Sequence, residues 1–291
     1  MQAADLLENP ASRTFISQRL RLHYVEWGNP DAPLLIMVHG GRDHCRNWDW
    51  LAKELRDGWH IIAPDLRGHG DSAHSQDGSY SMEALAYDLA QLVHELGQEP
   101  VSIIGHSLGG NVAVRYSGLY PETVRRLVVI EGLRPNEDRD PKAIDAKLRG
   151  WIERKRAISI RTPRRYTSLD DAFARMMEEN SHLSAERARH LTVHGMNRNE
   201  DGTFSWKFDN YLHAWPPVDL TDDDLHGLWR NVTCPTLLAY GAQSWAKNPA
   251  EDGRAAHFRD CRVSLYAEAG HWLHHDQHEK FTAEVKDFLL D

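Results

Sequence analysis

The feature of this sequence that most constrains its fold is an alternation between short apolar segments and amphipathic ones. Four segments rich in Val, Ile and Leu, at residues 33–38, 60–64, 101–104 and 127–130, each end near Gly, Asp or Glu. Short apolar runs of this kind are typical of parallel strands buried on both faces. An amphipathic segment that begins after Ser81 repeats apolar residues at helical spacing. We therefore predict an α/β fold, with helices covering both faces of a mostly parallel, doubly wound sheet.

The alternation stops near residue 134 and returns after residue 233. The later part predicts strands at 236–240 and 263–266, a helix near 249–258 and a last helix at about 278–290. The intervening stretch opens with the polar run 134–142 and has helical character. We expect residues 1–134 and 233–291 to form the core domain, and residues 135–232 to form a mainly helical cap inserted over one edge of the sheet.

Local patterns support helices and one hairpin within the insert. Ser168 with Asp171, and Thr221 with Asp224, have the spacing of a capping box at a helix N-terminus. Apolar aromatic residues alternate over residues 204–208, which predicts a short hairpin or an extended packing segment.

Composition limits the partners that the chain can have. With 34 Lys and Arg against 43 Asp and Glu, the net charge is −9, which argues against nucleic acid or an anionic membrane as a partner. The mean hydropathy is −0.60 and no apolar run approaches the ~20 residues of a membrane span. The N-terminus lacks a signal-peptide pattern, and three cysteines without a CxxC motif do not suggest a disulfide framework. We expect a cytoplasmic protein, with a homodimer as the protein assembly that the sequence allows.

The strongest local signal is the pentapeptide Gly105-His-Ser-Leu-Gly109, which contains Ser107. An apolar strand segment leads directly into it and a helix-like segment follows. Such a strand-to-helix turn holds a serine in a strained conformation, with its hydroxyl exposed at the carboxyl edge of the sheet. The alternative is a glycine-rich packing turn whose serine only caps the helix.

Acyl transfer also requires backbone N–H groups that stabilise the negative charge on the carbonyl oxygen. The N–H of Leu108 is one candidate, because the turn itself positions it. The second should come from the loop after the strand at 33–38, where His39-Gly40-Gly41 stands. We choose Gly41, with Arg42 as the alternative.

Chain position selects one base among 18 histidines. His271 follows the strand predicted at 263–266, and reacting groups in open parallel sheets gather at the carboxyl ends of strands. His39 belongs to the proposed oxyanion loop, and His106 should point away if Ser107 points up. Residues 271, 274, 275 and 278 are histidines at helical spacing, but Gly270 and the lack of nearby Cys argue against a metal site there. We expect no metal and no cofactor.

The acid that orients His271 has two candidate positions. The strand end at 127–130 is followed directly by Glu131, one strand from the serine. The later strand end offers no carboxylate until Glu251 and Asp252, and the position three residues beyond Gly241 is Ser244. We expect Glu131 to be the acid and keep Asp252 or Glu251 as the alternative.

These motifs resemble the α/β-hydrolase superfamily, in its cap-bearing serine hydrolase and esterase branch. The resemblance covers nearly the whole chain outside the insert and rests on the following segments: residues 39–41, 65–72, 105–109, 235–238 and 270–271. It implies an α/β-hydrolase fold and a structural role for residues 65–72. In this family the acid usually follows the penultimate strand, where this chain has Ser244. Certain haloalkane dehalogenases and a fungal-toxin lactonase instead take a Glu at the position of Glu131. A serine nucleophile is unlike the Asp of dehalogenases and epoxide hydrolases.

Four tryptophans are the candidates to line a substrate pocket, namely Trp151, Trp206 and Trp215 in the insert and Trp272 beside His271. The alternative for the tryptophans of the insert is that they form the core of the cap and its contact with the main domain. Eight basic residues against one acidic residue occur between Lys147 and Arg165. This run could bind an anionic tail such as a coenzyme A phosphate, or be a solvated helix face.

We therefore predict a serine hydrolase that cleaves a small, mainly apolar carboxylic ester through an acyl-enzyme. Ser107 is the expected nucleophile, His271 the base and Glu131 the acid. Two alternatives use the same chemistry: a lactonase, from the position of Glu131, and a thioesterase, from the basic run. A third is a non-catalytic receptor for a small ligand on the same fold.

Overall fold

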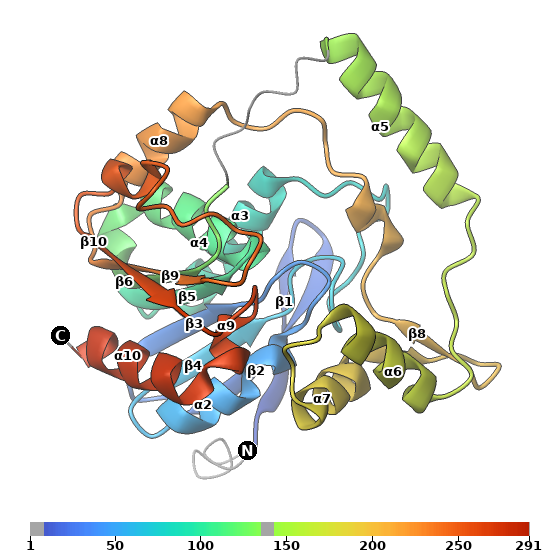
Figure 1. Ribbon diagram of the computed structural model, residues 1–291, viewed down its shortest axis with the longest axis horizontal. Coiled ribbons are helices and arrows are strands. Elements are labelled where there is room, and N and C mark those ends of the chain that lie inside the picture. The colour runs from blue at the N-terminus through green and yellow to red at the C-terminus, as the bar shows by residue number, and fades with distance from the viewer. Residues whose placement is uncertain (1–8, 135–142, 291) are drawn as a thin grey trace.

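A computed structural model describes residues 9–134 and 143–290 (Figure 1). The strands of its main sheet are β1 (Ala11–Ser17), β2 (Leu20–Gly28), β3 (Leu34–Val38), β4 (His60–Pro64), β5 (Val101–His106), β6 (Val124–Ile130), β9 (Thr236–Gly241) and β10 (Cys261–Tyr266). Their order across the sheet is β1-β2-β4-β3-β5-β6-β9-β10. From β4 to β10 the neighbouring strands are parallel, whereas β2 is antiparallel to both β1 and β4. The predicted α/β-hydrolase fold with a mostly parallel sheet is thus confirmed.

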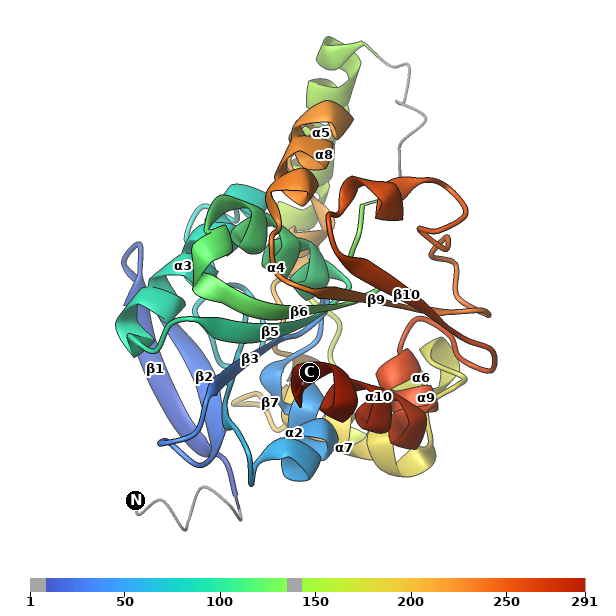
Figure 2. The ribbon, with the colours of Figure 1, turned by 90° about the vertical axis from the view of Figure 1, so that its left-hand side faces the viewer.

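Helices cover both faces of the sheet, as Figure 2 shows from its edge. The core helices are α2 (Asp49–Leu55), α3 (Met82–Leu96), α4 (Leu108–Leu119), α9 (Leu273–Asp276) and α10 (His278–Leu290). In β3, Ile36 packs into the apolar cluster shared with α3 and α4, and Met37 into the cluster shared with α2 and α10. Burying each such side chain contributes about 1.5–3 kcal/mol. Every residue of β3, β4 and β5 is buried, which explains the continuous apolar runs in the sequence.

Two features of the core differ from the prediction. The hairpin of β1 and β2 was not anticipated, because β1 lies at the edge of the sheet and exposes several polar residues. The prediction of a helix near 249–258 is wrong. This segment contains only the short 3₁₀ helix η4 (Arg254–His257), which follows Gly253 at φ 83°. A left-handed residue at that point does not continue a helical backbone.

Between β6 and β9 lie α5 (Ile144–Ser159), α6 (Leu169–Glu179), α7 (Ala185–Gly195), the hairpin strands β7 (Met196–Arg198) and β8 (Phe204–Trp206), the 3₁₀ helix η3 (Asn210–His213), and α8 (Asp222–Asn231). Ser168 caps α6, and Thr221 forms a complete capping box with Asp224 at α8. The polar run at the start of the insert falls largely on residues 135–142, which lie outside the described residues.

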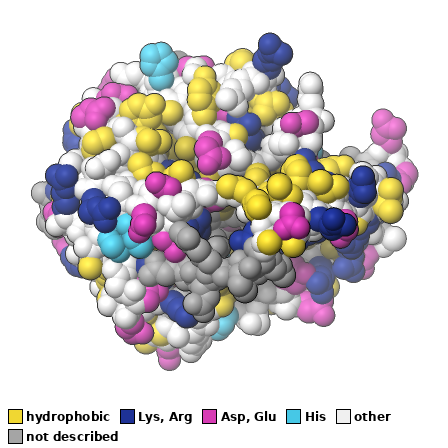
Figure 3. Space-filling model, turned by 90° about the horizontal axis from the view of Figure 1, so that it is seen from above, with side chains coloured by type: hydrophobic (Ala, Val, Ile, Leu, Met, Phe, Trp, Pro, Cys, Tyr) yellow, Lys and Arg dark blue, Asp and Glu magenta, His cyan; other side chains and the backbone are white. Residues whose placement is uncertain are grey.

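The helices of this segment occupy different places in the fold. α8 packs against α4, and its Trp229 is buried in the core cluster of that face. α6 and α7 pack together through Ala188 and Leu191. α5 stands away from the body (Figure 1) and carries a row of exposed apolar side chains (Figure 3), which includes Leu148 and Ile152. No helix within residues 9–134 and 143–290 combines the length and the apolar character needed to cross a bilayer.

Candidate active site

Ser107 occupies the sharp bend between β5 and α4. Its φ of 51° lies in the left-handed region, which a serine adopts only at a cost in free energy. The bend is tight enough to exclude side chains on both flanks. A Cβ on Gly105 would lie 2.6 Å from the carbonyl oxygen of Gly109, and a Cβ on Gly109 would lie 2.3 Å from that of Val38. The two glycines of the motif are therefore required by close backbone contacts.

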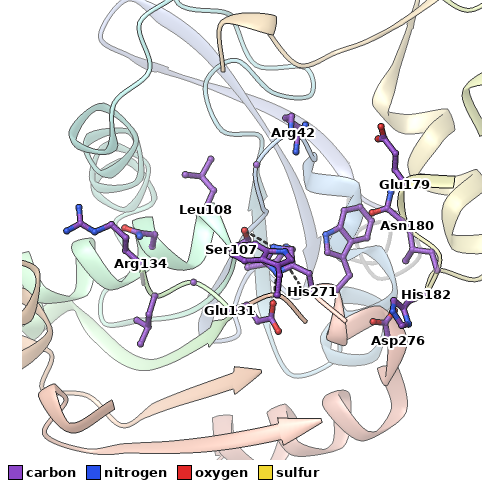
Figure 4. A pocket seen from close by; sticks show the side chains of 18 of the residues that line it. Arg42, Ser107, Leu108, Glu131, Arg134, Glu179, Asn180, His182, His271 and Asp276 are labelled. Atoms are coloured by element: carbon purple, nitrogen blue, oxygen red, sulfur yellow. Dashed lines mark hydrogen bonds and ion pairs between the residues drawn. The ribbon is translucent and has the colours of Figure 1, made fainter. Parts of the chain in front are cut away.

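The structure brings Ser107, His271 and Glu131 together in the predicted order. Ser107 Oγ lies 2.9 Å from His271 Nε2, and His271 Nδ1 is hydrogen-bonded to Glu131 Oε2. Figure 4 shows the three side chains meeting at one side of a cavity. They follow β5, β10 and β6, so each is delivered by the carboxyl end of a strand. A hydrogen bond from Nδ1–H to a carboxylate leaves Nε2 free to accept the serine proton.

The Glu131 carboxylate has three hydrogen-bond donors, and Ser244 is one of them. Ser244 Oγ donates to Glu131 Oε2 at 2.6 Å, and the backbone N–H of Gly241 donates to Oε1 at 2.7 Å. Glu131 is 4% exposed, so these donors compensate for its burial. Ser244, at the position where the resemblance leads one to expect the acid, thus donates a hydrogen bond to the carboxylate that meets His271. Its presence three residues after Gly241 could have suggested this role.

The alternative acid, Asp252, is engaged elsewhere. Both of its carboxylate oxygens accept hydrogen bonds from Nε of Arg254, at 2.9 and 2.8 Å. Burial alone would raise the pKa of Asp252, but these bonds to Arg254 bring it below its usual value. The structure therefore pairs His271 with Glu131 and pairs Asp252 with a buried arginine.

The loop after β3 lies against the serine bend, as the sequence predicts for an oxyanion loop. A Cβ on Gly40 would come within 3.4 Å of Ser107 Cβ, and one on Gly41 would contact the Leu108 side chain at 3.7 Å. His39 holds this loop by donating from Nδ1 to the Gly40 carbonyl, while its Nε2 accepts the backbone N–H of Leu66. Burial lowers the pKa of His39, so the ring is neutral and can accept that bond.

His106 connects the serine bend to the loop that carries His271. Its Nε2–H donates to the backbone carbonyl of His271 at 3.0 Å, which links the serine bend to the loop that carries His271. Burial, followed by the nearby histidines His274 and His271, lowers the pKa of His106 well below its usual range. A neutral ring in this position adds no positive charge beside His271.

A cavity of about 630 Å³ opens above Ser107. Of the four predicted tryptophans, Trp215 and Trp272 line it. Trp206 does not line it, because its ring packs beside Tyr166 and its indole N–H donates to Tyr166 Oη. Trp151 does not line it either, because its indole N–H donates to the Ala214 carbonyl.

Sequence reasoning did not anticipate several other lining residues. Trp245 follows β9, and its ring centroid lies 4.8 Å from that of His271. The position of Trp245 after a strand end could have been used to predict this contact. His182, between α6 and α7, reaches the cavity only because the insert folds over the strand ends. No local pattern indicates that placement.

Two groups of side chains in the described residues are close enough to bind a metal, His23 with Cys45 and Asp65, and Asp49 with His190 and His194. Both are already engaged within the protein. Asp65 accepts hydrogen bonds from the His23 ring and the Cys45 backbone, and Asp49 is paired with Arg46. Neither group belongs to the cavity lining, so these contacts explain the residues without a role in the reaction.

Comparisons with known proteins identify the family of this chain. Residues 33–277 match the family described as the alpha/beta hydrolase fold. An esterase of Mycobacterium tuberculosis is 28% identical over 272 residues, which cover 91% of this chain and 85% of that protein. Epoxide hydrolase 4 of Mus musculus is 25% identical over 293 residues, which cover 94% and 77%. A solved structure of a hypothetical protein from Pseudomonas aeruginosa is 28% identical with a TM-score of 0.83, and the match covers 96% of this chain and 97% of that one.

The relatives include esterases and epoxide hydrolases, and they support hydrolase activity for this chain. The family match spans the strands that carry all three clustered side chains, from β3 to the segment just beyond His271. This protein therefore belongs to the α/β-hydrolase family.

Proposed function

We propose that the protein is a serine hydrolase that cleaves carboxylic esters through an acyl-enzyme. The observation that carries this proposal is the 2.9 Å contact between Ser107 Oγ and His271 Nε2, with Glu131 bonded to the other ring nitrogen. This arrangement has a nucleophile, a base within hydrogen-bond reach and a group that orients the base, which are the requirements of covalent acyl transfer.

The proposed reaction has two stages. Ser107 Oγ attacks the ester carbonyl carbon while His271 Nε2 takes the hydroxyl proton, and the N–H groups of Gly41 and Leu108 stabilise the oxyanion. His271 then gives the proton to the departing alkoxide, which leaves the acyl group on Ser107. Water, deprotonated by His271, releases the acid and restores the serine. Loss of one oxyanion donor would slow the reaction by about 10²–10³.

The identity of the nucleophile favours an ester over an epoxide. Serine attack on an ester gives an acyl-enzyme, which is itself an ester that water can hydrolyse. Serine attack on an epoxide would give an ether, which a histidine base cannot cleave. The chemistry of Ser107 thus supports turnover of carboxylic esters.

We also propose that residues 135–232 act as the cap, and that Trp215 and Trp272 supply apolar contacts to the substrate.

The proposal is tested with a fluorophosphonate probe, which labels only an activated serine. We expect labelling of the intact protein, and its loss in Ser107→Ala together with loss of p-nitrophenyl ester hydrolysis. Ser117→Ala is a matched control, because Ser117 is buried on α4 and its hydroxyl donates to the Ala113 carbonyl of its own helix, its one hydrogen-bond partner among the described residues. If the intact protein is not labelled and hydrolyses no ester, the proposal fails and a ligand receptor is favoured.

A further inference from the structure

We propose that the substrate carries an anionic group, a carboxylate or a phosphate, which Arg42 binds beside the scissile carbonyl. This inference rests on the proposed function, since it names the substrate class of the same site. It differs from the mainly apolar substrate expected from the tryptophans. It depends on the charges in the cavity, the backbone at residue 42 and the surroundings of its side chain.

Of the two arginines that line the cavity, Arg42 is the one without an ion pair to a described residue, and it is exposed. Arg134 and Glu179 also line it, but each is held in ion pairs, with aspartates for Arg134 and with Arg175 for Glu179. Glu131 is bonded to His271. Asp276 accepts the backbone N–H of Gly270 through Oδ2, while its Oδ1 is buried without a hydrogen-bond partner among the described residues. The guanidinium of Arg42, by contrast, makes no hydrogen bond or ion pair with any residue in 9–134 or 143–290. A bound anion would give this guanidinium a hydrogen-bonded partner of opposite charge.

The backbone at Arg42 indicates a role for its side chain. Five non-glycine residues in the described parts of the chain have positive φ. Two of them, Gln18 and Arg19, form the tight turn between β1 and β2, where positive φ is the norm. The other three are Arg42 at 62°, Ser107 at 51° and Glu131 at 49°, and all three line the cavity.

Glycine would occupy position 42 at a lower cost in free energy than arginine. The loop already has glycine at the two preceding positions, so the chain departs from the cheaper residue just where the cavity begins. Strained residues persist where they serve a function. Since the other two strained cavity residues belong to the proposed catalytic group, we assign a function in the same site to Arg42.

Arg42 has a second arginine, Arg161, in its neighbourhood. Arg42 directly follows Gly41 of the oxyanion loop, and Figure 4 shows its side chain across from Glu131, with Ser107 between them. His213 lies close by: burial first, and then the charges of Arg42 and Arg161, lower its pKa. Arg161 belongs to the basic run that starts at Lys147, so one member of this run lies near His213 and Arg42.

A guanidinium binds carboxylates and phosphates through paired, charge-assisted hydrogen bonds. A neutral isostere of the anion would leave the guanidinium without this partner. A hydrogen bond to a charged group contributes a free energy that corresponds to about ten- to a hundredfold in binding. The neutral isostere should lose binding by this factor. The preference for an anionic over a neutral substrate therefore measures the interaction directly.

The test compares two pairs of substrates that differ in charge at a fixed position. The first pair is mono-p-nitrophenyl glutarate and its terminal carboxamide. The second is p-nitrophenyl 4-phosphonobutanoate and its neutral dimethyl phosphonate ester. The readout is the ratio of kcat/KM within each pair, which cancels any general disturbance of the oxyanion loop.

We expect the protein to prefer the anionic member of one pair, and Arg42→Gln to lower that ratio ten- to a hundredfold. A lowered ratio in the glutarate pair identifies a carboxylate, and one in the phosphonate pair a phosphate-like group. Arg42→Lys should lose less, because it keeps the charge. Arg19→Gln is the matched control, since Arg19 has the same left-handed backbone (φ 69°) outside the cavity. Arg42→Gly, which relieves the backbone, provides a folded variant if Arg42→Gln is unstable.

The inference is overturned if both ratios in Arg42→Gln and Arg42→Gly stay within twofold of those of the unaltered protein. It then fails alone, because ester hydrolysis and fluorophosphonate labelling persist. If the unaltered protein hydrolyses none of the four compounds and is not labelled, the proposed function fails with it.

Discussion

Replacing Glu131 by Gln keeps the shape of the side chain but changes which ring nitrogen of His271 carries the proton. Oε1 of Glu131 accepts the backbone N–H of Gly241, while Oε2 accepts from Ser244 and His271. Glutamine has one acceptor oxygen and one NH₂ group. If its oxygen stays at Gly241, its NH₂ faces His271 Nδ1, which must then accept. The ring proton moves to Nε2, and His271 can no longer take the proton of Ser107.

The opposite orientation of the glutamine is costly in this site. Its NH₂ would face the N–H of Gly241, and a buried unsatisfied donor costs about 1–3 kcal/mol. The productive tautomer would then form in roughly one molecule in 5 to 150. The negative charge that stabilises the imidazolium is lost as well. Together these effects predict a fall in kcat of ~10⁴, the size seen when an oriented catalytic Asp becomes Asn, or about 5.4 kcal/mol in the barrier.

The assay is steady-state hydrolysis of a p-nitrophenyl ester by the intact protein, by Glu131→Gln and by Asp252→Asn. We expect the first variant to lose kcat with a similar KM, and the second to stay within a few-fold. Thermal unfolding checks that both variants are folded, since Asp252 is paired with Arg254. The reasoning would be refuted by a Glu131→Gln enzyme within tenfold of the unaltered protein, and a collapse of Asp252→Asn would move the triad to the later loop.

Two further outcomes follow from the structure. Burial lowers the pKa of His44 to about 4 and that of His69 to about 3, so below the unfolded value near 6.5 the unfolded chain binds more protons. As the pH falls below 6.5, each group should therefore lower the free energy of unfolding by about 1.4 kcal/mol per pH unit. Urea unfolding midpoints that stay unchanged from pH 7 to pH 5 would contradict this. Trp215→Ala should raise KM for apolar esters about tenfold, whereas Trp206→Ala should lower the melting temperature and leave KM within twofold. The reverse pattern would place Trp206 in the substrate site.

The glycine loop after β3 and the serine bend were predictable because each is a local structure. An apolar strand followed by Gly-x-Ser-x-Gly leaves few backbone paths, and Gly105 and Gly109 are needed wherever that bend occurs. His271 was predictable from chain order, since parallel strands bring their carboxyl ends to one edge. The edge hairpin of β1 and β2 was missed because its exposed face carries polar residues, which weaken the apolar pattern.

The sequence by itself determined the parallel sheet, the strained serine and the order of the proposed catalytic residues, because these follow from apolar periodicity and from short-range backbone geometry. Only the tertiary structure decided which carboxylate meets His271, how Ser244 supports it, which tryptophans reach the cavity and that Arg42 lies there without a partner. Each of these depends on contacts between segments far apart in the chain. Local patterns favoured Glu131 but left Asp252 and Glu251 open, because strand order and the packing of distant segments set these contacts.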